Sequence, residues 1–83
     1  MKFSRHARNN MRLYNISERD ISETIDLPEI IDREGIKMIT IKKIQNRFSG
    51  YPLKVVYEKR ENELFIITTY PLKKKLWRWK PWK

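Results

Sequence analysis

Two β-rich runs in the second half of the chain carry the clearest pattern of apolar and polar positions. Within residues 53–60, Val55 and Tyr57 would point to the same face of a strand, whereas residues 63–70 are apolar on both faces. The polar pair Glu61-Asn62 separates the two runs and predicts a β-hairpin. Because a strand that is apolar on both faces is typical of a sheet interior, we expect further strands beside it and other elements over at least one face.

Two helices are predicted near the start of the chain. Ser4 is a typical N-cap, and residues 5–14 have the spacing of a helix of about three turns. Ser17 and Asp20 form a loose capping box at the start of a second helix, which Pro28 ends because the residue before a proline avoids the helical region. Two short helices joined by a tight turn can cover one face of a sheet.

Two more strands are expected between the second helix and the hairpin. They run over Glu29–Arg33 and Ile36–Ile44, on either side of Glu34-Gly35, and residues 45–52 form the following loop. The predicted fold is therefore α+β, with two N-terminal helices packed on one face of a four-stranded, mainly antiparallel sheet. Residues 1–71 would form this single domain, and residues 72–83 a basic, tryptophan-rich tail.

Chain length and residue usage narrow the class of protein. Eighty-three residues allow one small core, and without cysteine the chain has neither disulfides nor a cysteine-based metal site. The first ten residues lack the apolar stretch of a signal peptide, and no run is long enough to span a membrane. We expect a cytoplasmic protein with no cofactor and no metal.

Charge is concentrated at the end of the sequence. The net charge is +9, and residues 71–83 contain no acid. Six basic residues lie there: Lys73, Lys74, Lys75, Arg78, Lys80 and Lys83. This distribution favours a polyanionic partner, either nucleic acid, an acidic protein or an anionic membrane surface.

Aromatic side chains and cations alternate in the tail. Trp77 and Trp79 alternate with Arg78 and Lys80, and Trp82 follows. Such a segment can stack bases while neutralising phosphates, or lie at a membrane interface. Alternatively, its indoles cover part of a small core or fill a dimer interface.

The motif SRHARNNMRLYNIS at residues 4–17, with LKVVYEK at 53–59 and ITTYPLK at 67–73, resembles a family of small prokaryotic proteins of unknown function. Its members begin with a Ser-Arg/Lys-His-Ala box and end their last strand near Thr-x-Tyr-Pro. More distantly, the order of elements is similar to that of RelE/ParE and BrnT toxins of type II toxin–antitoxin systems. That resemblance implies a toxin-like protein that acts on RNA, with an acidic antitoxin as its partner. Many such toxins cut RNA without a metal.

Metal-free RNA cleavage requires a base and an acid for proton transfer, and cations beside the developing phosphorane. The only histidine, His6, suits proton transfer near neutrality, and arginine matches phosphate oxygens. The candidate catalytic residues are therefore His6, Arg5, Arg12, Lys54, Tyr57 and Tyr70. Each also has a structural interpretation, since a single histidine near a helix start is often a packing residue and tyrosine is common in strands.

The same chain can be interpreted as a binding module without catalysis. Arg5, Arg8 and Arg12 fall on one stripe of the first predicted helix, although such a stripe is often solvated or paired with acids. The candidate nucleic-acid-binding residues are Arg5, Arg8, Arg12, Lys73, Lys74, Lys75, Trp77, Arg78, Trp79 and Lys80. Two hypotheses follow: a metal-free endoribonuclease of a toxin–antitoxin pair, or a non-catalytic nucleic-acid-binding module. A homodimer is compatible with both.

Overall fold

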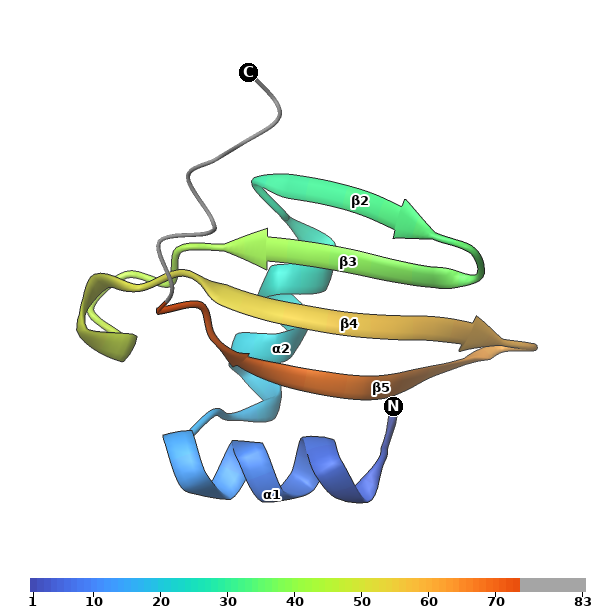
Figure 1. Ribbon diagram of the computed structural model, residues 1–83, viewed down its shortest axis with the longest axis horizontal. Coiled ribbons are helices and arrows are strands. Elements are labelled where there is room, and N and C mark those ends of the chain that lie inside the picture. Colours follow the sequence, from blue (N-terminus) through green and yellow to red (C-terminus); the bar gives the residue numbers. More distant parts are fainter. Residues whose placement is uncertain (74–83) are drawn as a thin grey trace.

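In the computed structural model, which describes residues 1–73, two helices and five strands form an α+β fold. In chain order the elements are β1 (Lys2–Phe3), α1 (Arg5–Tyr14), α2 (Glu18–Asp26), β2 (Ile30–Glu34), β3 (Lys37–Lys42), β4 (Leu53–Arg60) and β5 (Glu63–Pro71). A short 3-10 turn, η1 (Phe48–Gly50), lies between β3 and β4. In Figure 1 the sheet lies in front of α2, and α1 runs beside β5.

Both helices begin where their capping residues predict. The Ser4 hydroxyl accepts a hydrogen bond from the Ala7 amide at 2.9 Å, so α1 begins at residue 5. At α2 the capping box is complete, because Ser17 Oγ accepts from the Asp20 amide and Asp20 Oδ2 accepts from the Ser17 amide, each at 3.0 Å. These local bonds satisfy amide groups that have no partner within the helix.

The sheet contains a strand that the sequence pattern does not predict. Its strand order is β1-β5-β4-β3-β2, and β1 pairs with β5 in parallel, with Lys2 beside Phe65 and Phe3 beside Ile66. The expectation of four strands is therefore wrong: the sheet has five strands and is mixed. Two residues are too few to show the alternation by which a strand is recognised in a sequence. The remaining neighbouring strands pair antiparallel.

A bulge interrupts the pairing of β4 with β5. Val56 lies opposite Thr68 and Tyr57 lies opposite Ile66, so Ile67 is an extra residue on β5. The carbonyl of Ile67 accepts a hydrogen bond from the Ser4 hydroxyl at 2.6 Å. The bulge thus presents a backbone acceptor to the residue that caps α1.

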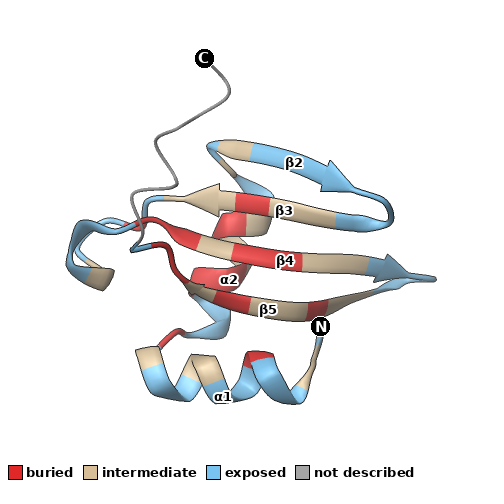
Figure 2. Ribbon diagram, viewed as in Figure 1, coloured by how far each residue is buried: buried red, intermediate tan, exposed pale blue. Residues whose placement is uncertain are grey.

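The core lies between the helices and one face of the sheet. Its buried apolar side chains come from α1, α2, β4 and β5, and from the α1–α2 turn and the loop after β3; Figure 2 shows buried residues in red. They are Ala7, Ile16, Ile21, Ile44, Leu53, Val55 and Ile66. After β5, Leu72 is also buried, and its amide donates to the Pro52 carbonyl at 2.8 Å.

Candidate nucleic-acid interface

Helix α1 is held along the outer edge of β5 by hydrogen bonds that its N-cap residue and one of its side chains donate to β5. The Ser4 amide donates to the Ile66 carbonyl at 3.0 Å, and the side-chain amide of Asn10 donates to the Thr69 carbonyl at 3.1 Å. Beyond Ile66, β5 has no pairing with β1, so these bonds satisfy carbonyls at an open strand edge. With one face held against the sheet, the opposite face of α1 is left to solvent.

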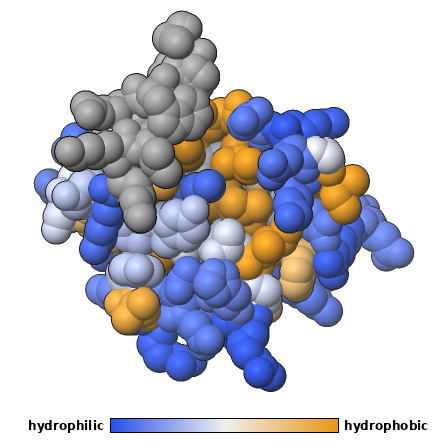
Figure 3. Space-filling view, in the orientation of Figure 1, coloured by the Kyte–Doolittle hydropathy of each residue, from blue (hydrophilic) through white to orange (hydrophobic). Residues whose placement is uncertain are grey.

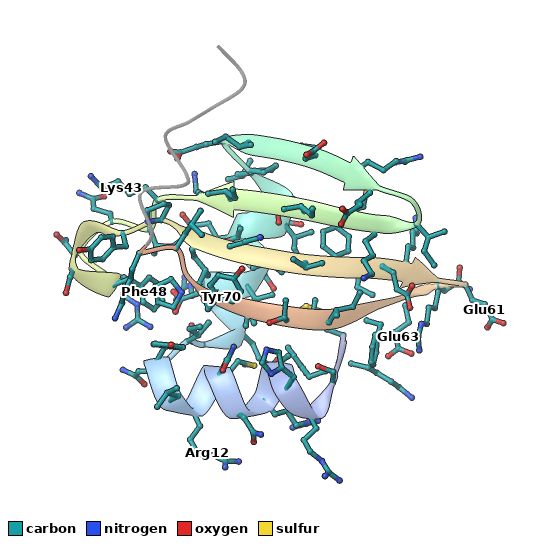
Figure 4. All side chains as sticks on the ribbon, in the orientation of Figure 1. Arg12, Lys43, Phe48, Glu61, Glu63 and Tyr70 are labelled. Atoms are coloured by element: carbon teal, nitrogen blue, oxygen red, sulfur yellow. The ribbon has the colours of Figure 1, made fainter. Side chains whose placement is uncertain are left out.

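Three arginines occupy the solvent side of α1. Arg5, Arg8 and Arg12 are all exposed, and we call them the arginine stripe. The guanidinium carbon of Arg8 lies 5.6 Å from the centre of the Phe3 ring. In Figure 4 the Arg12 side chain points away from the sheet. A planar guanidinium presented in this way can take up phosphate oxygens in pairs.

The arginine stripe lacks acidic partners within residues 1–73. The two ion pairs of this region are Arg47 with Asp20, at 2.6 Å, and Arg60 with Glu58. The acids of α2 therefore do not neutralise α1, although the sequence allowed such pairs. The stripe keeps its charge available for an external anion.

His6 lies on the same helix and is also exposed. Its Nε2 atom is 3.5 Å from Asn10 Nδ2, the nitrogen that also donates to Thr69. The ring is therefore beside the edge of β5, where an incoming ligand can reach it.

The candidate residues of the sheet fall on two different faces. Lys54 and Tyr70 are opposite each other on β4 and β5, with Lys54 Nζ 5.5 Å from the centre of the Tyr70 ring. Tyr57 instead packs against the core, on the face that the helices cover. Tyr70 and Arg12 extend in different directions in Figure 4. The six candidate catalytic residues are thus distributed over α1, the open face of the sheet and the core, and the structure does not bring all of them together.

The candidate residues after β5 are described only at their start. Lys73 is exposed, and its Nζ atom is 5.4 Å from the centre of the Tyr14 ring, at the last residue of α1. Lys74, Lys75, Trp77, Arg78, Trp79 and Lys80 lie outside the described residues.

Two polar anchors of the site were not assigned a role from the sequence. Asn10 bonds to a carbonyl 59 residues away, and its only signal is its spacing of four from His6. Arg47 Nη2 donates to the Asn15 carbonyl at 2.7 Å and to the Asp20 carboxylate at 2.6 Å. These bonds join the loop before β4 to the α1–α2 turn. No local pattern indicates them, because both depend on tertiary contacts.

Comparison with known proteins places the chain in a family. A model for a domain of unknown function (DUF4258) matches residues 3–71. No curated protein and no solved structure matches the chain significantly. Within the described part of the chain, no helix is long and apolar enough to cross a membrane.

Proposed function

We propose that this chain, which belongs to the DUF4258 family, binds RNA through the arginine stripe of α1. One observation carries the proposal: the three stripe arginines are exposed, and none of them takes part in the ion pairs formed within residues 1–73. Cations presented without counterions are the usual means of binding a phosphate backbone, because each contact releases ions condensed on the nucleic acid.

The length of α1 lets the arginine stripe contact RNA at several positions instead of one. α1 has ten residues and is therefore about 15 Å long. Arg5 and Arg12 are seven residues apart and lie about 10 Å from each other along the axis. That spacing lets the stripe contact phosphates at separate positions along a strand. RNA is preferred to DNA because of the resemblance to RelE/ParE and BrnT toxins, and the assay below compares the two.

Binding is proposed ahead of cleavage because of where the sheet residues lie. A ribonuclease site built from His6, Lys54 and Tyr57 would need these side chains to face one ligand, yet Tyr57 packs against the core on the opposite face of the sheet from Lys54. His6 and the arginine stripe can still meet one RNA, so toxin-like cleavage is a defined outcome of the same assay. An acidic antitoxin would occupy the stripe in competition with RNA.

The test uses a labelled single-stranded RNA and a DNA of the same sequence, in EDTA and about 0.1 M salt. Replacing Arg5, Arg8 and Arg12 together with glutamine removes up to three phosphate contacts, and affinity for RNA should fall about a hundredfold. Arg19→Gln is the matched control, because Arg19 is also an exposed helical arginine but lies among acids on α2. Equal binding by the triple variant and the wild type would refute the proposal.

The same reactions report cleavage. If the RNA is cut to products with 2′,3′-cyclic phosphate ends, and His6→Ala abolishes the cutting while retaining binding, the protein is a ribonuclease with His6 in its site. Intact RNA that shifts in a gel supports binding alone.

A further inference from the structure

The face of the sheet that points away from the helices carries an apolar patch. Its members are Ile30, Ile39, Ile41, Val56 and Phe65, which we call the open-face patch. Strand pairing brings the four aliphatic members together, because Ile39 lies opposite Val56 and Ile30 opposite Ile41. Phe65 lies further along the sheet, opposite Glu58, and the guanidinium carbon of Arg60 is 4.0 Å from the centre of its ring. Figure 3 views this face and shows apolar residues running from its upper margin through its middle, with polar residues below them.

Neither helix covers this patch. α1 and α2 supply core residues to the opposite face of the sheet, where Val55 and Leu53 are completely buried. On the open face, Ile39 and Ile41 remain partly accessible to water, whereas Val56 beside them is only 8% exposed. A contiguous apolar surface flanked by charges usually marks a contact with another segment or molecule.

We propose that residues 74–83 of the same chain cover the open-face patch. The segment follows the end of the sheet that carries Ile30 and Ile41, since β5 ends at Pro71 opposite Leu53, and Ile41 lies opposite Lys54. Ten residues can extend about 33 Å. The distance across the sheet from β5 to β2 spans three strand spacings, about 14 Å. The segment is therefore long enough to cross every strand of the patch.

The chemistry of the segment matches the patch. It contains Leu76 and three tryptophans, at 77, 79 and 82, and an aromatic side chain can bury about 150–250 Å². Residues 74–83 form a net cation, with five basic residues and no acid. The open face carries Lys37 and Lys54, but across the patch β2 also presents the exposed carboxylates of Asp32 and Glu34, where they can meet these cations. The outer side of α1 is unsuitable for the same segment, because the arginine stripe repels it.

Tryptophan fluorescence measures this contact directly, because all three tryptophans of the protein lie in residues 74–83. The full chain without nucleic acid should emit at shorter wavelength than a synthetic peptide of residues 74–83, and acrylamide should quench it less. Ile39→Lys places a charge in the patch and should shift the emission towards that of the peptide. Emission of the wild type equal to that of the peptide would overturn the proposal.

Two further variants separate docking from misfolding. Ile31→Lys introduces the same charge on the neighbouring strand, but Ile31 is 59% exposed and lies on the other face, so the emission should not change. Asp32→Asn with Glu34→Gln alters exposed positions only and should weaken docking without loss of far-UV circular dichroism.

The concentration of protein distinguishes a segment of the same chain from a second copy. Docking within one chain predicts an emission spectrum that is independent of dilution. A shift that disappears on dilution would overturn the proposal in favour of exchange between copies. The inference is separate from RNA binding, because the fluorescence is measured without RNA and leaves the arginine stripe unaltered.

Discussion

The side-chain amide of Asn10 donates to the backbone carbonyl of Thr69 at 3.1 Å and so joins α1 to β5 across 59 residues of sequence. Ser4 makes a similar bond to Ile67, two residues earlier on β5. Together they position α1, and with it the arginine stripe, relative to the sheet. The orientation of the proposed RNA surface therefore depends on two short polar side chains.

Replacing Asn10 with alanine should lower the free energy of unfolding by about 1 kcal/mol, because the Thr69 carbonyl loses its donor. Urea denaturation measures the loss. Asn9→Ala is the matched control, since Asn9 is exposed on the same helix and should change stability by less than about 0.5 kcal/mol. Equal losses in the two variants would show that the bond to Thr69 contributes nothing specific.

Asp20 serves both the α2 cap and the loop before β4. Asp20→Ala should cost about 2 kcal/mol, because its carboxylate accepts from the Ser17 amide and from Arg47. A double-mutant cycle with Arg47→Ala should give a coupling of about 1 kcal/mol, moderate because the Arg47 side chain is 34% exposed. Glu18→Ala, in the same helical turn, should cost less than about 1 kcal/mol. Additive effects of Asp20→Ala and Arg47→Ala would mean that the ion pair does not contribute.

Adjacent threonines on β5 should respond in opposite directions to valine. Thr68 Oγ1 is buried and has no hydrogen-bond partner among residues 1–73, so Thr68→Val should raise stability by about 1 kcal/mol. Thr69 Oγ1 donates to the Lys54 carbonyl at 2.9 Å, and Thr69→Val should lower stability by a similar amount. Thermal unfolding should show shifts of about 4–8 °C of opposite sign. A loss of stability in Thr68→Val would indicate that its hydroxyl has a partner outside the described residues.

The salt dependence of RNA binding measures how many stripe arginines contact phosphates of the RNA. Each stripe arginine that binds a phosphate of single-stranded RNA contributes about 0.7 to the slope of log K against log salt concentration. Arg5→Gln, Arg8→Gln and Arg12→Gln should each reduce the slope by that amount, whereas Arg19→Gln should not. Identical slopes in all four variants would place the RNA elsewhere on the protein.

Features determined by nearby residues followed from the sequence. Ser4 and Ser17 begin the helices through bonds within three residues, and the polar pair Glu61-Asn62 separates β4 from β5. The strand β1 could not be predicted in this way, because it exists only through the pairing of its two residues with residues 65 and 66. Local pattern carries no information on such distant pairing.

For the site, the arginine stripe follows from helical spacing, and the structure places all three arginines on the exposed side of α1. Tyr57 and Tyr70 share their chemical type but not their place in the sheet. Alternation along β4 already puts Tyr57 on the side of Val55, against the core, and the register puts Tyr70 beside Lys54 on the other side. The face of the strand on which a residue lies is therefore a better guide than its chemical type to which polar groups can meet.

The pairing of β1 with β5 has a consequence for how the protein is made. A ribosome delivers residues 2–14 long before residues 63–71, yet the main contacts of α1 with the sheet are to β5. Until the last strand emerges, the apolar side of α1 lacks the strand on which it mainly packs. The arginine stripe can therefore take its folded orientation only once synthesis has passed β5, and the polypeptide emerging earlier lacks the arranged cationic surface.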